Sequence, residues 1–113
     1  MTLDQSIVVL PDWQTLTSTY PTVATDIATW INANTDALKI AITVNLGDLV
    51  ETNSVSSEWE AADAAYDILD VANNPYLIGI GNHEGGTLSR GAETYFNTYF
   101  PQARYTAKDW WDG

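Results

Sequence analysis

The sequence predicts an α/β fold in which a mainly parallel sheet is flanked by helices. Three short apolar runs bounded by proline or glycine predict strands, and a stretch with helical periodicity follows each of them. A chain that runs β-α-β-α-β-α builds a parallel sheet through right-handed crossovers. The length of 113 residues suits one domain covering residues 1–113.

The predicted strands are residues 7–10, 40–46 and 76–80, which are rich in Ile, Val and Leu. Pro11 closes the first run, Gly47 closes the second, and Pro75 and Gly81 bound the third. Apolar runs of this length, bounded in this way, are typical of strands that are buried on both faces of a sheet.

Apolar residues at helical spacing predict one helix after each strand. Pro21 suits the first turn of the first helix, Ser57 with Glu60 gives a capping-box pattern at the second, and Pro101 ends the third. The apolar stripes are Val23, Ile27, Trp30 and Ile31, then Val55, Trp59, Ala62, Tyr66 and Leu69, then Leu88, Ala92, Tyr95, Phe96 and Tyr99.

Charge and composition exclude several classes of partner. The chain has 15 acidic and 4 basic residues and a formal net charge of -11, which argues against nucleic acid and anionic membranes as partners. It has no cysteine, so any metal must bind to oxygen and nitrogen ligands. We find no apolar stretch of membrane-spanning length and no signal peptide, and we expect a soluble protein in an unspecified compartment.

Polar residues follow each predicted strand at the edge where parallel sheets bind ligands. Asp12 and Gln14 follow the first strand, Asp48 the second, and Asn82 the third. Neighbouring strands lie about 4.8 Å apart, so we expect these side chains to converge into an oxygen-rich cluster that suits divalent metals. Each residue alone could belong to an ordinary turn, whereas their occurrence at three successive strand ends favours a site.

His83 is the only histidine of the chain, and it follows Asn82 directly. A neighbouring carboxylate would orient its imidazole and raise its pKa, which suits a general acid. Glu51 lies close enough in sequence to support the cluster from outside. We expect Asp63, Asp67 and Asp70 to face solvent on their helix. We expect Trp110 and Trp111 to pack against a missing segment, and the alternative is an aromatic patch on the substrate side.

The motifs resemble the first three sequence blocks of the calcineurin-like metallophosphoesterases, which read D-x-H, then GDxx, then GNH followed by Asp or Glu. The matching segments are Asp12-Trp13-Gln14, Gly47-Asp48-Leu49-Val50 and Gly81-Asn82-His83-Glu84. The resemblance implies that the chain is the N-terminal half of a four-layer sandwich.

The resemblance also implies a function: hydrolysis of a small phosphoester by attack of a metal-bound hydroxide, with two divalent ions drawn from Mn, Fe, Zn or Mg. It implies that Asp12 and Gln14 bind the first ion, that Asp48 bridges both, and that Asn82 binds the second. His83 would be catalytic, with Glu84 as its partner.

The sequence departs from the family in two ways. Gln14 stands where the family usually has His, as in a branch with Asp-x-Gln, and the later His and GHxH ligands are missing. We therefore expect a truncated domain that binds metal weakly and hydrolyses little by itself. An exposed sheet face would then favour association with another chain.

The alternative is a non-catalytic α/β fragment that binds a divalent metal or a partner chain. A nucleotide-binding domain is disfavoured because neither a P-loop nor a G-x-G-x-x-G motif is present.

Overall fold

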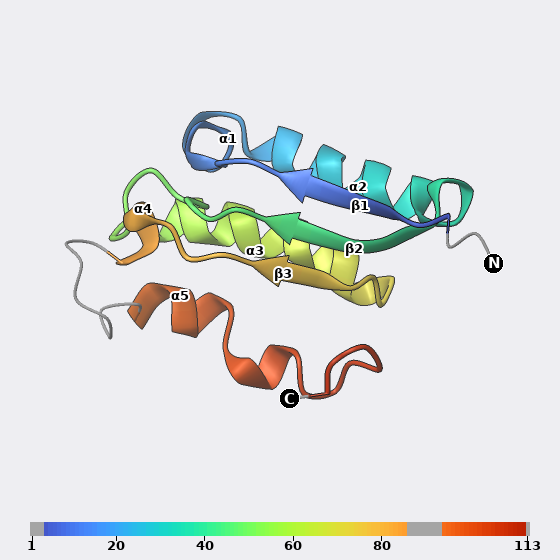
Figure 1. Cartoon of the computed structure of the whole chain (residues 1–113). Coiled ribbons are helices and arrows are strands. Elements are labelled where there is room, and N and C mark those ends of the chain that lie inside the picture. The colour runs from blue at the N-terminus through green and yellow to red at the C-terminus, as the bar shows by residue number, and fades with distance from the viewer. Residues whose placement is uncertain (1–3, 86–93, 113) are drawn as a thin grey trace.

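The computed structural model describes residues 4–85 and 94–112 and is an α/β structure built on a three-stranded parallel sheet (Figure 1). The strands lie in the order β1-β2-β3. They are β1 Ser6–Leu10, β2 Ile40–Asn45 and β3 Tyr76–Ile78. The predicted parallel α/β sheet is confirmed, although β2 and β3 end before the apolar runs do.

The helices follow the strands in the predicted alternation, with additional short elements. They are α1 Gln14–Thr19, α2 Pro21–Leu38, α3 Ser56–Val71, α4 Asn82–Gly85, α5 Thr94–Tyr99 and the 3₁₀ helix η1 Gln102–Arg104. The sequence did not predict α1, whose three threonines give it a weak intrinsic helix propensity.

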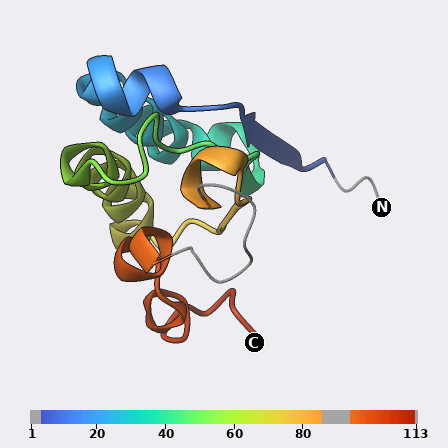
Figure 2. The same cartoon turned by 90° about the vertical axis from the view of Figure 1, so that its left-hand side faces the viewer.

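The helices α1, α2 and α3 gather on one side of the sheet (Figures 1 and 2). The strand order explains this arrangement. Each crossover moves the chain one strand further in the same direction, and right-handed connections then place both connecting helices on the same face. Among the described residues the sheet is therefore flanked by helices on one face, whereas parallel sheets are usually covered on both.

The covered face of the sheet, which we define as Val8, Leu10, Thr43, Asn45, Tyr76 and Ile78, packs on α2 and α3. Tyr66 of α3 lies at the centre of this core and is fully buried. Its ring centroid is 4.8 Å from that of Tyr76, 5.6 Å from that of Trp13 and 5.4 Å from that of Phe100. Aromatic rings thus join α3, the sheet and the C-terminal segment.

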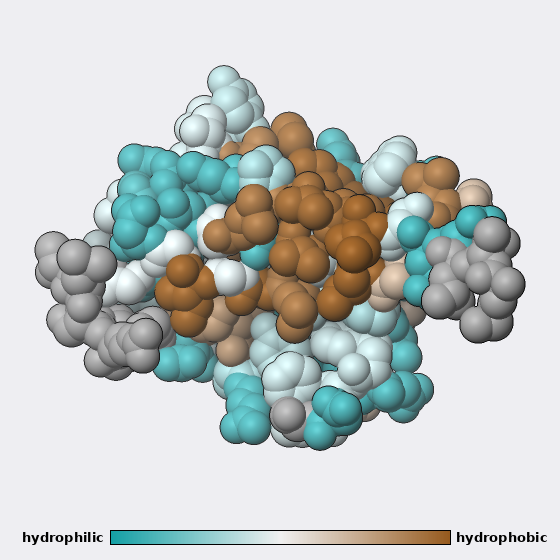
Figure 3. Space-filling model, viewed as in Figure 1, coloured by the Kyte–Doolittle hydropathy of each residue, from teal (hydrophilic) through white to brown (hydrophobic). Residues whose placement is uncertain are grey.

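The open face of the sheet carries apolar side chains that no helix of the described residues covers. Val9 pairs with Val44, and Val44 pairs with Leu77, so a row of apolar residues crosses all three strands. Figure 3 shows the resulting hydrophobic patch over the strands. Strand alternation assigns to this open face Ile7, Val9, Ile42, Val44, Leu46 and Leu77.

The predicted buried stripe of α2 is partly wrong. Ile31 is buried, but Val23 is 39% exposed and Trp30 is 52% exposed. Ala24 and Ala28 are buried instead, because small side chains allow α2 to approach α3 closely.

The predicted stripe of α3 is confirmed from Trp59 to Leu69, but its capping box is wrong. The residue before α3 is Val55, which makes no side-chain cap, so the pair Ser57 and Glu60 does not define the start. In the third stripe, Leu88 and Ala92 lie outside the described residues. Phe96 is buried and Tyr99 partly buried, and α5 ends shortly before Pro101, as predicted.

The C-terminal segment is fastened to α3 by Arg104, whose side chain is 10% exposed. Its guanidinium binds Asp63, Asp67 at 2.9 Å and Asp70 at 2.7 Å. The prediction that these acids face solvent holds for Asp67, which is 65% exposed, but is wrong for Asp63 and Asp70. The spacing of the acids along α3 directs all three at one cation. Trp110 and Trp111 pack on Tyr105 of the same segment, so they serve packing, whereas packing against a missing segment stays a prediction.

Within residues 4–85 and 94–112, no helix combines the length and the apolar character that a membrane crossing requires.

Candidate functional site

The loops that follow the three strands are joined by hydrogen bonds, and Asp48 lies at their centre. The backbone N–H of Trp13, in the first loop, donates to the carbonyl oxygen of Asp48 at 2.9 Å. The backbone N–H of His83, beyond the third strand, donates to Oδ1 of Asp48, also at 2.9 Å. The structure therefore brings the Asp12, Asp48 and Asn82 segments together at the carboxyl edge of the sheet.

The backbone at Asp48 adopts a left-handed conformation, with φ of 53°. This region is sparsely populated for residues other than glycine and is retained only where surrounding contacts enforce it. Gly47 before it has φ of 101°, and its N–H donates to Oδ1 of the buried Asn45 at 2.8 Å. The chain thus turns sharply off β2 and directs Asp48 toward the neighbouring loops.

Gly47 and Gly81 allow the second and third loops to touch at the level of the backbone. A Cβ atom on Gly47 would lie 2.6 Å from the nitrogen of Gly81. A Cβ atom on Gly81 would lie 2.1 Å from Oδ1 of Asp48. Because neither gap accepts a methyl group, any other residue would push the two loops apart.

Asp12 and Gln14 lie at the first strand end, where the chain enters α1. Oδ1 of the exposed Asp12 accepts a hydrogen bond from the backbone N–H of Gln14 at 2.7 Å. This contact is the ordinary turn interaction of an aspartate two residues before its donor. A carboxylate has two oxygens and several lone pairs, so Asp12 keeps capacity for a further ligand.

Asn82 is exposed and begins α4, and the half-buried His83 follows it. Nδ1 of His83 lies 2.6 Å from the carbonyl oxygen of Glu51. That hydrogen bond is the largest cause of a pKa of His83 above its usual 6.5, and the charges of Asp48, Glu51 and Glu84 raise the pKa further. The backbone carbonyl of Glu51 therefore orients the imidazole. The sequence had suggested the carboxylate of Glu84 for this role.

Glu84 is fully buried, and its carboxylate binds the backbone of two loops. Oε2 accepts hydrogen bonds from the N–H groups of Asp48 at 2.8 Å and Gly81 at 2.6 Å. Oε1 accepts from the N–H of Leu49. Asn53 in turn donates from its side chain to the carbonyl oxygen of Glu84. The segments on both sides of the site are thus connected through this one residue.

Glu58 plays a similar part for the loop that contacts His83. It is 7% exposed, and its Oε2 accepts hydrogen bonds from the N–H groups of Glu51 at 2.7 Å and Thr52 at 2.8 Å. Neither Glu58 nor Asn53 could be predicted from the sequence, because side chains that bind backbone groups leave no sequence motif.

The donors at this edge fit one side of a divalent-cation site. Asp12 and Asp48 offer carboxylate oxygens, and Gln14 and Asn82 offer amide oxygens, which are the ligand types that hard cations prefer. Within residues 4–85 and 94–112, no three His, Asp or Glu side chains form a group able to hold a metal ion. Further ligands would have to complete the coordination shell.

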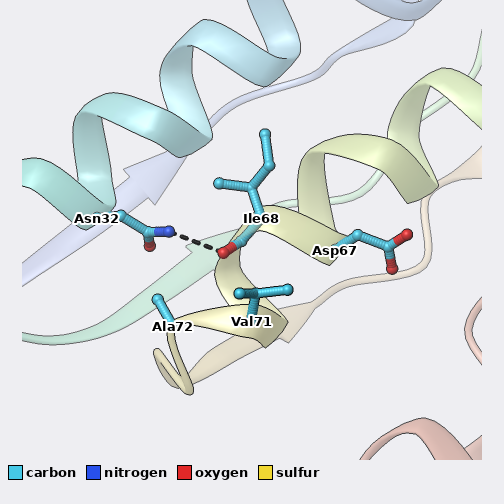
Figure 4. Close-up of a pocket in the computed structure, with 5 residues that line it drawn as sticks. All are labelled: Asn32, Asp67, Ile68, Val71 and Ala72. Atoms are coloured by element: carbon cyan, nitrogen blue, oxygen red, sulfur yellow. Dashed lines mark hydrogen bonds between the residues drawn. The ribbon is translucent and has the colours of Figure 1, made fainter.

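A shallow apolar hollow of about 330 Å³ lies away from this edge, between α2 and the end of α3 (Figure 4). Its rim is fixed by Nδ2 of Asn32, which donates to the carbonyl oxygen of Ile68 at 2.7 Å. The hollow offers no group of titratable residues, because its one carboxylate, from Asp67, is bound to Arg104. The carboxyl edge of the sheet is therefore the better candidate site.

Comparison of the chain with protein-family models, with curated proteins and with solved structures gives no match.

Proposed function

We propose that the chain carries the first part of the active site of a metal-dependent phosphoester hydrolase, either a phosphomonoesterase or a phosphodiesterase of the calcineurin-like type. The observation that supports the proposal is the placement of Asp48. It lies at the strand end to which the motif resemblance assigns a bridging ligand, in a strained conformation, and it is hydrogen-bonded to the loops on both sides. Strained, over-determined residues cluster at functional sites.

In this proposal Asp12, Gln14, Asp48 and Asn82 hold divalent cations. The cations would supply positive charge that neutralises the phosphoryl oxygens, which an acidic chain with net charge -11 lacks by itself. Oδ1 of Asp48 is engaged with the N–H of His83, and this contact fixes the orientation of the carboxylate while leaving lone pairs for a ligand.

His83 is the proton donor in this proposal. A carbonyl oxygen only accepts hydrogen bonds, so its contact with Nδ1 places a proton on that nitrogen and leaves Nε2 as the atom for chemistry. The raised pKa favours the imidazolium form, in which Nε2 also carries a proton. That proton can be donated to a phosphoryl oxygen or to the leaving group.

The motif resemblance also suggests what could cover the open face of the sheet. We propose that the three-stranded sheet is one sheet of a four-layer sandwich, whose second sheet would lie on the open face. The apolar row of Val9, Val44 and Leu77 supports this assignment, because parallel sheets are rarely left uncovered on one face.

The test is thermal unfolding of the purified chain during titration with Mn²⁺. A ligand that binds only the folded state stabilises it by about 2.7 kcal/mol at one hundred times its Kd. We expect Mn²⁺ to raise the melting temperature of the wild type and of Asp36→Asn, in which the exposed acid is on α2 near the opposite end of the sheet. Asp48→Asn should abolish the gain, and an equal gain in Asp48→Asn would contradict the proposal.

A second candidate is a non-catalytic α/β unit that binds a divalent metal or a partner chain. Two observations on the described residues favour it: they contain no group of three His, Asp or Glu that could hold a metal ion, and one face of the sheet is exposed. Hydrolysis of a chromogenic phosphodiester with Mn²⁺ separates the two candidates. Turnover that Asp48→Asn removes supports the enzyme, and metal binding without turnover supports the second candidate.

A further inference from the structure

Glu84 presents a buried negative charge that is held by backbone amides. Its side chain is fully buried, and its oxygens accept from the N–H groups of Asp48, Leu49 and Gly81. Among the described residues, ion pairs involve Arg104 and Lys108, so no cationic side chain is paired with Glu84. A buried carboxylate is costly unless hydrogen bonds compensate it, and here the compensating donors belong to the two loops of the candidate site.

These hydrogen bonds add to a second link between the loops, in which Oδ1 of Asp48 accepts from the N–H of His83. Gly47 and Gly81 meet at backbone contact, so neither glycine contributes a side chain that could hold the two loops together at this point. In addition, Asp48 has a φ of 53°, a conformation that persists only where surrounding contacts enforce it. The contact from Glu84 to the N–H of Asp48 is therefore one of the restraints that maintain this conformation.

The bond from Glu84 to Gly81 has the form of half a capping box. Gly81 precedes α4, and Glu84 is the third residue of that helix, which is the position from which a glutamate reaches back to the preceding N–H. The same oxygen that makes this local bond also binds Asp48, which is 36 residues distant in the chain. A local helix cap is thereby converted into a link between two strand ends.

We propose that Glu84 is a positioning residue that acts through Asp48: its carboxylate sets the left-handed turn and thereby aims the Asp48 carboxylate at a bound divalent cation. The proposal rests on the proposed function, in which Asp48 is a metal ligand. Glu84 itself does not touch the cation, because its oxygens are occupied by the three backbone donors.

The chain offers a matched control in Glu58. Glu58 is also buried and also accepts two backbone hydrogen bonds, but it holds Glu51 and Thr52 rather than Asp48. Glu84→Gln and Glu58→Gln both replace one acceptor oxygen by a donor group that faces backbone N–H groups, so both should lower the melting temperature.

The experiment measures Mn²⁺ affinity of the full chain by calorimetry, well below the melting temperature of each variant. We expect Glu84→Gln to weaken binding at least about tenfold, and Glu58→Gln to change it by less than about twofold. Glu84→Asp keeps the charge but shortens the side chain by one methylene, so it should weaken Mn²⁺ binding as well. This variant replaces Glu84→Gln in the measurement if Glu84→Gln does not fold. Equal affinities in wild type and Glu84 variants would overturn the proposal.

Amide hydrogen exchange gives a readout without metal. In the Glu84 variants the N–H groups of Asp48 and Gly81 should exchange at least about tenfold faster than in Glu58→Gln. If the wild type binds no Mn²⁺, the proposed function fails, and Glu84 is then judged by exchange alone. Faster exchange confined to the Glu84 variants supports its positioning role, and equal exchange in Glu58→Gln overturns it.

Discussion

Both faces of the sheet carry apolar side chains, but the two faces differ sharply in burial. On β1, Leu10 of the covered face is 5% exposed, while Val9 beside it on the open face is 58% exposed. On β3, Tyr76 is fully buried and Leu77 is 50% exposed. The difference lies in what packs on each face, because α2 and α3 lie against one side only.

This comparison shows that burial here is decided by topology rather than by the composition of the strands. Two right-handed crossovers in the same direction place both helices on one face, whatever residues the other face carries. An exposed apolar face is unusual in a parallel sheet, since such sheets are normally covered on both sides. Mutations on the two faces should therefore have very different effects on stability.

The largest expected effect is on the covered side, at Tyr66. Tyr66→Ala should lower the free energy of unfolding by about 3–5 kcal/mol, because it removes a fully buried ring that contacts Trp13, Tyr76 and Phe100. Urea unfolding followed by tryptophan fluorescence measures the change. Leu77→Ala on the open face is the counterpart and should cost only about 1 kcal/mol, because half of its surface is already in water.

A second variant at the same position separates the ring from its hydroxyl. The Tyr66 hydroxyl is buried and has no hydrogen-bond partner among the described residues. Tyr66→Phe should therefore be neutral or slightly stabilising. If Tyr66→Phe lowered the free energy of unfolding by more than about 1 kcal/mol, the hydroxyl would have a hydrogen-bond partner. A polar interaction would then contribute to the stability of the covered side.

An intermediate effect is expected at the rim of the covered side, where Arg104 joins the C-terminal segment to α3. Arg104→Met should cost about 2–4 kcal/mol, less than a fully buried ion pair, because Asp67 is 65% exposed while Asp70 is only 15% exposed. Limited proteolysis should then cleave the segment after α5 faster. Lys39→Met, at an exposed lysine after α2, is the control and should change neither quantity. Unchanged proteolysis in Arg104→Met would show that aromatic packing alone holds the segment.

The fold follows from the sequence as far as local patterns reach. The runs at residues 7–10, 40–46 and 76–80 predicted the strands, and their alternation with helices predicted a parallel sheet. The same runs could not reveal the open face, because residues 7–10 are apolar at every position and indicate burial on both sides. Likewise, Trp30 has helical spacing with Val23 and Ile27, and only the close packing of Ala24 and Ala28 decides which side of α2 is buried.

The site shows the same limit at the level of hydrogen bonds. The convergence of the Asp12, Asp48 and Asn82 segments was expected if the three strands are neighbours, and the strand order β1-β2-β3 meets that condition, whereas their metal-binding roles remain predictions. The partner of His83 did not follow, because a backbone carbonyl, that of Glu51, is present in every residue and has no sequence signal. One signal was available for Glu84: a glutamate three residues after a glycine that precedes a helix is half of a capping box.

A small effect on stability is expected on the open face itself. Val9→Lys places a charge on β1, an edge strand where lysine is a common guard against association. Because Val9 is already 58% exposed, we expect the substitution to change the free energy of unfolding of the chain by no more than about 1 kcal/mol. Association should change much more, since a lysine interrupts the apolar row that Val9 forms with Val44 and Leu77.

Light scattering over a range of protein concentrations, together with binding of a hydrophobic dye, distinguishes these outcomes. We expect the wild type to bind the dye and to gain apparent mass with concentration, and Val9→Lys to do both less. Val71→Lys is the matched control, because Val71 is 91% exposed but lies at the end of α3, away from the sheet. If Val9→Lys instead destabilised the chain as strongly as Tyr66→Ala, Val9 would have to be buried in solution. The difference in burial between the two faces would then be contradicted.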